Sequence, residues 1–212
     1  YVKNIKGIPK TIDYMDAFSK GIERRIPKAG LFFKTILKLE WRRLKKYEAE
    51  VFESFDYKTI ISLQDRDHII HPENARIKIV PNGVDINYFK PAGLEKKYEI
   101  LFSGNMGYPP NIEAALYLVK RILPLIKKIL PDVRLVIAGA NPSASVNSLK
   151  SEKIIITGWV EDMRPYYDAS KVFLAPMQTS IGMQNKILEA MAMKVPCITS
   201  HIANNAIYSR EG

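Results

Sequence analysis

Short apolar runs alternate with amphipathic stretches through the second half of the chain. Each run is four or five residues long and ends at a glycine or a polar turn, which is typical of buried strands. The expected strands are 99–103, 134–138, 154–157, 171–175 and 197–200. Helices are expected from Asn111, placed as the N-cap, to before Pro131, at 164–169, and from Gly182 to Met193. This alternation predicts an α/β fold in which right-handed crossovers join a parallel sheet.

The first half of the chain is less regular. Short strands are expected within 8–16, at 59–62 and at 77–80, with a polar helix at 65–70. A long helix is predicted from about Leu31 to Phe55, because apolar residues recur there every three or four positions: Phe33, Leu37, Trp41, Leu44, Val51 and Phe55. We interpret it as a packed amphipathic helix, with membrane contact as the alternative. Residues 84–98, interrupted by Pro91 and Gly93, are expected to be a linker.

Turn glycines follow several predicted strands, at Gly104, Gly139, Gly158 and Gly182. Ligands in parallel sheets bind at the carboxyl ends of the strands, where these loops lie. The loop at 104–107 is therefore a candidate phosphate loop that includes Asn105. It matches neither the G-x-G-x-x-G fingerprint nor a Walker motif, so a plain tight turn is the alternative. The loop Gly158-Trp159-Val160-Glu161-Asp162 can face a nucleobase through its backbone, while Asp162 caps the next helix.

The most informative stretch is Gly182-Met183-Gln184-Asn185-Lys186-Ile187-Leu188-Glu189 and the apolar residues that follow it. Glu189 is a carboxylate on an otherwise apolar helix, where burial without a partner is costly. Lys186 lies in the first helical turn, where the macrodipole disfavours a cation by roughly 0.3–1 kcal/mol. Both residues are explained if an anion docks at the helix N-terminus and a ribose diol meets Glu189. This pattern indicates a nucleotide site.

Composition narrows the choice of partners. The chain has 212 residues, 47% hydrophobic and 25% charged, as in ordinary globular proteins. Its net charge is +10, and residues 1–60 carry 14 Lys/Arg against 8 Asp/Glu, which favours anionic partners. Nucleic acid is discounted because no basic run with interleaved aromatic residues is present. The single cysteine, Cys197, is expected to be an inert core thiol, and His68, His71 and His201 lack metal-ligand spacing.

Four segments together carry a family resemblance: Val80-Pro81-Asn82-Gly83-Val84-Asp85, Phe102-Ser103-Gly104 through Asn111, Gly158–Asp162 and Gly182–Met193. They resemble the family 4 glycosyltransferases of the GT-B fold, in particular bacterial exopolysaccharide sugar transferases whose helix opens Gly-x-Gln-Asn-Lys. The resemblance is strong over 77–200 and weaker over 1–76. It implies that residues 1–85 are the end of the acceptor-side N-terminal domain with the interdomain crossover. Residues 86–212 would be the truncated, Rossmann-like, nucleotide-sugar-binding domain.

The resemblance also implies roles for particular residues. Glu189 would bind the ribose hydroxyls, Gly104 and Asn105 would approach the diphosphate, and the loop Gly158-Trp159-Val160 would lie by the base. The expected donor-binding set is Gly104, Asn105, Gly158, Trp159, Val160, Gly182, Met183, Gln184, Asn185, Lys186 and Glu189. Three positions depart from the family pattern: Ile181 replaces the usual first Glu, Asn105 replaces a common Arg, and Pro109-Pro110-Asn111 replaces a common Lys. The last two remove positive contacts to the diphosphate. Lys186 is therefore our candidate for a cation that contacts the diphosphate.

The implied activity is transfer of a sugar from a nucleotide-diphosphate donor to a polysaccharide or lipid-linked acceptor, with retention of the anomeric configuration. No cofactor and no metal are expected, and the catalytic residues on the acceptor side are not identified. The expected setting is bacterial cell-envelope polysaccharide synthesis, in the cytoplasm, with an anionic inner-membrane surface as a further candidate partner. A GT-B nucleotide-sugar epimerase and a non-catalytic nucleotide-sugar-binding module are the alternatives. Since no initiator Met is present, we expect a fragment of a longer protein that is inactive by itself.

Overall fold

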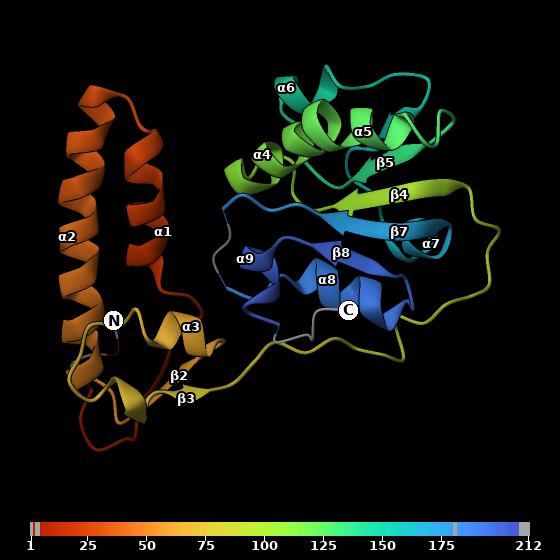
Figure 1. Ribbon diagram of the computed structural model, residues 1–212. Coiled ribbons are helices and arrows are strands. Elements are labelled where there is room, and N and C mark those ends of the chain that lie inside the picture. The colour runs from red at the N-terminus through yellow and green to blue at the C-terminus, as the bar shows by residue number, and fades with distance from the viewer. Residues whose placement is uncertain (1, 3–4, 180–181, 208–212) are drawn as a thin grey trace. The chain divides into compact units, whose positions relative to one another are not determined.

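The computed structural model describes residues 2, 5–179 and 182–207, which form two compact units (Figure 1). Unit 1 takes in residues 1–82 together with 179–183. Unit 2 takes in residues 83–178 and 184–212. The segment from 80 to 97 has no helix or strand, as expected for a linker between regular elements.

Unit 1 is built on a small parallel sheet with the strand order β1-β2-β3. Its strands are β1 (Thr11–Asp13), β2 (Tyr57–Ile60) and β3 (Lys78–Ile79). Its helices are α1 (Phe18–Arg25), the 3-10 turn η1 (Ile26–Lys28), α2 (Leu31–Glu53), α3 (Leu63–Arg66) and the 3-10 turn η2 (Asn74–Arg76). Figure 1 shows α1 and α2 side by side, and the two helices pack against each other.

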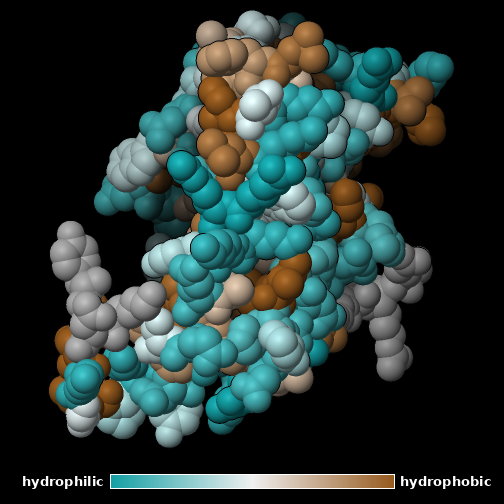
Figure 2. All heavy atoms as spheres, turned by 90° about the vertical axis from the view of Figure 1, so that its left-hand side faces the viewer, coloured by the Kyte–Doolittle hydropathy of each residue, from teal (hydrophilic) through white to brown (hydrophobic). Residues whose placement is uncertain are grey.

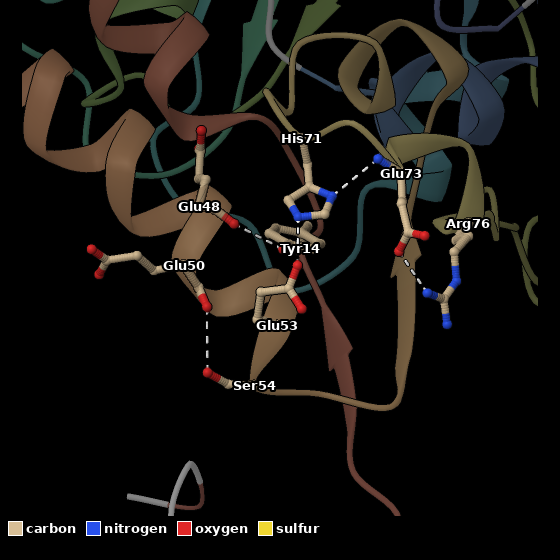
Figure 3. A network of polar contacts seen from close by, with 8 residues as sticks. All are labelled: Tyr14, Glu48, Glu50, Glu53, Ser54, His71, Glu73 and Arg76. Carbon is tan, nitrogen blue, oxygen red and sulfur yellow. Dashed lines mark hydrogen bonds and ion pairs between the residues drawn. The ribbon is translucent and has the colours of Figure 1, made fainter.

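Polar contacts hold the lower end of α2 to its neighbours (Figure 3). Glu48 is buried, and its Oε1 accepts a hydrogen bond from the N–H of Ser19 at 3.0 Å, in the first turn of α1. The hydroxyl of Tyr14 donates to the backbone oxygen of Glu48 at 2.9 Å. His71 stacks on Phe52 at a ring separation of 3.8 Å, and its Nε2 lies 2.7 Å from a carboxylate oxygen of Glu53. The last turns of α2 are therefore fixed in place.

Unit 2 is a five-stranded, all-parallel sheet with the order β6-β5-β4-β7-β8. Its strands are β4 (Tyr98–Ser103), β5 (Leu135–Ala138), β6 (Ile154–Ile156), β7 (Ser170–Ala175) and β8 (Cys197–Thr199). The chain runs outward from β4 to β6 and then returns to the other side of β4 to form β7 and β8. The strand order therefore reverses between β4 and β7, and ligands bind at such a switch point in α/β sheets.

Helices cover both faces of this sheet, with α4 and α5 on one side and α8 on the other (Figure 1). The helices of unit 2 are α4 (Pro109–Tyr117), the π-helix η3 (Leu118–Ile122), α5 (Leu123–Lys127), α6 (Ala144–Asn147), α7 (Arg164–Asp168), α8 (Asn185–Ala192) and α9 (His201–Asn204). The core between the layers includes Leu101, Phe102, Leu135, Ile137 and Phe173, all fully buried. The predicted α/β fold with a parallel sheet is confirmed.

Several local predictions are wrong. Asn111 is not an N-cap, because α4 already begins at Pro109 and the N-cap residue is Tyr108. A proline at the first helical position fits, since its missing N–H has no partner there in any helix. Phe33 does not belong to a packed face, since 63% of it is exposed. The short helices α1, α6 and α9 have too few turns to show a clear apolar period, and the sequence analysis missed them.

Candidate functional site

Three strand-end glycines of unit 2 lie next to one another at the carboxyl edge of the sheet. Gly139 follows β5, and its N–H donates to the backbone oxygen of Gly158, which follows β6, at 3.1 Å. A Cβ atom built on Gly139 would lie only 1.9 Å from the backbone oxygen of Gly104, which follows β4. Gly139 also has a φ of +136°, which side chains disfavour. No other residue fits at position 139. The backbones of the loops at Gly104, Gly139 and Gly158 are consequently in direct contact.

The loop from β4 to α4 is held in a fixed shape by hydrogen bonds from its backbone N–H groups. The N–H of Met106 donates to the oxygen of Ala140 at 2.7 Å, and the N–H of Gly107 donates to Oδ1 of Asn105 at 3.0 Å. Within the described part of the chain, the N–H of Asn105 donates to no protein acceptor. The loop thus presents one unused backbone donor at the switch point between β4 and β7, where an anion can accept it.

Lys186 reaches this loop from the first turn of α8. Its Nζ donates a short hydrogen bond to Oδ1 of Asn111 and lies 5.0 Å from the ring centroid of Phe102. Burial lowers the pKa of Lys186 to about 8, against the opposing effect of the Glu189 carboxylate. The ammonium is consequently charged at neutral pH, and only neutral groups make direct contacts with it among the described residues.

Glu189 lies one turn further along α8 and has a protein partner. Its Oε2 accepts a hydrogen bond from the hydroxyl of Tyr167 at 2.8 Å, and that hydroxyl lies 2.9 Å from the Oγ of Ser103. Tyr167 is fully buried; burial, followed by the nearby Glu189 charge, raises the pKa of its hydroxyl, which stays protonated. No described residue hydrogen-bonds Oε1 of Glu189, so one carboxylate oxygen is left for a ligand.

The predicted base loop has the expected turn but an open side chain. Gly158 has a φ of +72°, and Trp159 is 73% exposed. Asp162 accepts a hydrogen bond from the N–H of Arg164, the first residue of α7, at 2.9 Å. It is not the N-cap as predicted, because that position is taken by Met163. The Arg164 guanidinium, through its hydrogen bonds, also holds the pKa of the Asp162 carboxyl below its usual range. No hydrogen bond joins Trp159 or Val160 to Lys186 or Glu189 within the described residues.

The opening of the predicted nucleotide helix divides between the units. Gly182 has the positive φ that its turn requires, at +63°, but Gly182 and Met183 belong to unit 1. Gln184 is the N-cap residue of α8, its oxygen accepts from the N–H of Ile187 at 2.9 Å, and Asn185 is the first helical residue. Ile181, at the position of the usual first Glu, lies outside the described residues. The site described here therefore uses residues of unit 2 alone.

Two residues of this site were missed as functional candidates. Tyr167 connects Ser103 on β4 to Glu189 on α8, yet in the sequence it is one tyrosine in a short predicted helix. Asn111 was interpreted as a helix cap. Its side chain instead bridges the β4–α4 loop and Lys186, since its Nδ2 donates to the oxygen of Asn105 at 2.9 Å. The Tyr167–Ser103 and Asn111–Lys186 contacts leave no local sequence signal, because they join residues 64 and 75 positions apart.

The remaining titratable candidates lie apart from this site. The Cys197 thiol is half-buried on β8, and burial raises its pKa to about 11, as expected for an unreactive thiol. His71 is paired with Glu53 in unit 1. Across the residues that the structure describes, no group of three or more His, Cys, Asp and Glu side chains could hold a metal ion.

Comparison with known proteins identifies the class to which this fold belongs. The family model of glycosyl transferases, group 1, matches residues 97–212, which is more than half of the chain. The chain belongs to this family. Among solved structures, the Anabaena protein HepE in complex with UDP and glucose superimposes with a TM-score of 0.67 at 14% identity, over 96% of this chain and 55% of that one. The structure is therefore that of a GT-B glycosyltransferase fold.

Two curated relatives are closer in sequence. An Escherichia coli UDP-Gal:α-D-GlcNAc-diphosphoundecaprenol α-1,3-galactosyltransferase is 27% identical over 76% of this chain and 48% of its own length. A 44.6 kDa protein of the cps region of Klebsiella pneumoniae is 25% identical over 53% of this chain and 31% of its own length. The chain thus spans about half the length, or less, of the curated relatives it matches.

Proposed function

We propose that the protein to which this chain belongs transfers a sugar from a nucleoside-diphosphate donor to a saccharide or lipid-linked acceptor, with retention at the anomeric carbon. Family membership supports a glycosyl transfer. The observation that carries the proposal is that a cation, Lys186, and a carboxylate with one oxygen left for a ligand, Glu189, lie on the same helix at the switch point of the sheet. In the transfer, the bond from the anomeric carbon to the diphosphate oxygen breaks and a bond to an acceptor oxygen forms, with loss of the acceptor proton.

Each group of site residues is assigned to one part of the donor: the diphosphate, the ribose or the base. Lys186 and the N–H of Asn105 stabilise the negative charge that develops on the leaving diphosphate. Oε1 of Glu189 accepts from the ribose hydroxyls, and Gly158, Trp159 and Val160 line the base. Residues 86–212 are then the donor-binding domain, and residues 1–85 are acceptor-side. UDP is the first nucleotide to test, because UDP is bound by the Anabaena protein and a UDP-sugar donor is named for the E. coli relative.

Calorimetry with UDP tests the donor site. We expect Glu189→Ala to weaken binding by about 1–3 kcal/mol, the range for a hydrogen bond to a charged group. Glu152→Ala is the matched control, because Glu152 is an exposed glutamate just before the amino end of β6 and should leave the affinity unchanged. An unchanged affinity in a folded Glu189→Ala variant would remove Glu189 from the site. Transfer itself is measured with a saccharide or lipid-linked acceptor, and UDP-sugar isomers formed without acceptor would indicate an epimerase.

The surface of α2 suggests a second partner, an anionic membrane surface. Its first turns expose Leu31 at 90%, Phe32 at 75% and Phe33 at 63%, and Figure 2 shows hydrophobic side chains gathered toward the upper end of this side, bordered by hydrophilic ones. Lys34, Lys38 and Arg42 follow on the same helix. An apolar stripe beside basic side chains is the pattern of helices that lie in an anionic bilayer surface. No described helix combines the length and the apolar character needed to cross a bilayer.

Vesicle sedimentation tests this surface. Basic residues near an anionic leaflet contribute roughly 1 kcal/mol each, screened by salt. We therefore expect salt-sensitive binding to anionic but not neutral vesicles, weakened when Lys34, Lys38 and Arg42 are changed to Glu. The control changes three exposed lysines outside α2 to Glu, namely Lys90, Lys97 and Lys150, and should bind more strongly than the α2 variant. Equal binding to both vesicle types, or none at low salt, would mean that this helix face packs against protein.

A further inference from the structure

Asn111 occupies a central place in the strand-end site without being a group that a nucleotide need touch. It lies in the first turn of α4 and is 6% exposed. Nδ2 donates to the oxygen of Asn105 in the β4–α4 loop at 2.9 Å, while Oδ1 accepts from Nζ of Lys186 on α8. We propose that Asn111 is a positioning residue, which holds the Lys186 ammonium against the β4–α4 loop for the diphosphate. This inference rests on the proposed function and adds a residue to its site.

The close approach at Gly104 shows that the ammonium is held at the loop and not merely near it. A Cβ atom built on Gly104 would lie 2.8 Å from Nδ2 of Asn111 and 3.1 Å from Nζ of Lys186. The missing side chain at 104 therefore leaves the space in which the amide and the ammonium meet. A phosphate that accepts from the free N–H of the next residue, Asn105, would lie beside this ammonium.

The chemistry of the neighbours matters as much as their positions. The amide oxygen of Asn111 contacts Lys186 from α4, and the Phe102 ring faces it from β4 at 5.0 Å. Both groups attract a cation, yet neither carries a charge that would cancel it. A carboxylate in place of the amide would form an ion pair and compete with the phosphate. An asparagine thus orients the ammonium and leaves its charge for an anionic ligand.

The charged and titratable groups around Lys186 are few among the described residues. Glu189 on α8 is a carboxylate that acts to raise the pKa of Lys186, and Tyr167 on α7 is neutral because burial raises the pKa of its hydroxyl. Burial dominates and brings the pKa of Lys186 to about 8. An anion held by this ammonium should therefore bind well at pH 7 and lose affinity as the pH rises through 8.

The test measures UDP affinity by calorimetry between pH 6.5 and 9.5 for three substitutions. Asn111→Leu removes both hydrogen bonds and should weaken binding roughly tenfold at pH 7, as for loss of a charge-assisted contact. Asn111→Asp keeps the acceptor oxygen and the size but adds a negative charge. It should also weaken binding at pH 7 and move the midpoint of the affinity loss to higher pH. Asn147→Asp is the matched control, since the Asn147 side-chain amide donates to the backbone oxygen of Pro142 at 3.0 Å and, among the described residues, hydrogen-bonds no lysine side chain.

Lysine side-chain NMR on the free chain provides a readout that needs no nucleotide. The Lys186 pKa should rise in Asn111→Asp and stay unchanged in Asn147→Asp. If Asn111→Leu fails to fold, the Asn111→Asp variant decides by itself. An unchanged Lys186 pKa in the Asn111→Asp variant would overturn the positioning role of Asn111. This holds even if UDP binds to the original chain and binds more weakly to a Lys186 variant, as the proposed function expects. Conversely, equal UDP affinity in the original chain and in Lys186→Met would overturn the role of Lys186 in the proposed function.

Discussion

Similar apolar residues are buried in the central strand β4 of unit 2 but exposed in the first turns of the long helix α2 of unit 1. In β4, Leu101 and Phe102 are fully buried between two helical layers. In the first turns of α2, Phe32 and Phe33 pack edge to face at 5.7 Å and yet remain mostly exposed. The difference teaches that hydrophobicity alone does not mark a core position. A strand in a covered sheet has no free face, whereas a helix needs a neighbour on its apolar side.

The same contrast holds for polar groups. In unit 2 the buried hydroxyl of Tyr167 meets Ser103 and Glu189, which link a strand end to a helix that bears the candidate site. In unit 1 the hydroxyl of Tyr14 donates to the backbone oxygen of Glu48, in a contact that joins two structural elements. The buried Tyr167 hydroxyl thus contributes to the candidate site, while the Tyr14 hydroxyl fastens α2 to the segment after β1.

Truncation of matched phenylalanines should give the largest difference between the units. Phe173 lies in the core of unit 2 with no exposed surface, so Phe173→Ala should lower the free energy of unfolding by about 3–5 kcal/mol. Phe33→Ala should change it by no more than about 0.5 kcal/mol, because the ring is mostly exposed. Urea denaturation followed by circular dichroism measures both. A comparable loss in Phe33→Ala would show that the first turns of α2 pack against protein.

Removal of single hydroxyl groups should give a smaller and graded difference. Tyr167→Phe leaves Ser103 and Oε2 of Glu189 without their shared partner and should cost about 1–3 kcal/mol of stability. Tyr14→Phe removes one neutral hydrogen bond and should cost about 0.5–1.5 kcal/mol. The measurement is again urea denaturation. A larger loss of stability in Tyr14→Phe than in Tyr167→Phe would contradict this prediction.

The smallest expected effect is a pH dependence in unit 1. Burial, together with the nearby Asp65 and Asp13 carboxylates, raises the pKa of Asp16 to about 6. The folded state therefore binds more protons than the unfolded state between about pH 4 and 6, so this contribution to stability falls as the pH rises through that window. Asp16→Asn should raise the melting temperature at pH 7 and flatten its dependence on pH. We expect less than about 1 kcal/mol, since solvent screens a partly exposed carboxylate.

An Asp13→Asn variant is the control for that prediction. Asp13 lies in the same acidic group but is exposed. Its replacement should relieve some repulsion without removing the slope between pH 4 and 6. A slope that is unchanged in Asp16→Asn would assign the pH dependence to another group.

The sequence predicted the elements of unit 2 well, because strands such as β4 and β5 are continuous apolar runs that end at glycines. It located Lys186 and Glu189 as unusual residues on their helix, since their charge conflicts with that environment. It did not find the extended π-helical turn η3, nor the partner of either residue. A partner on another element leaves no periodic pattern, because its spacing in the chain depends on the intervening crossovers.

By itself, the sequence determined the parallel α/β class, the succession of the five strands of unit 2, and the unusual placement of Lys186 and Glu189 on an apolar helix. These follow from local patterns: apolar period, turn residues and charge. Only the tertiary structure decided that Asn111 faces Lys186, that Tyr167 takes one oxygen of Glu189, and that the first turns of α2 stay uncovered. The physical reason is that burial and hydrogen-bond partners depend on which distant segments the sheet brings together, whereas local patterns record only what each segment prefers.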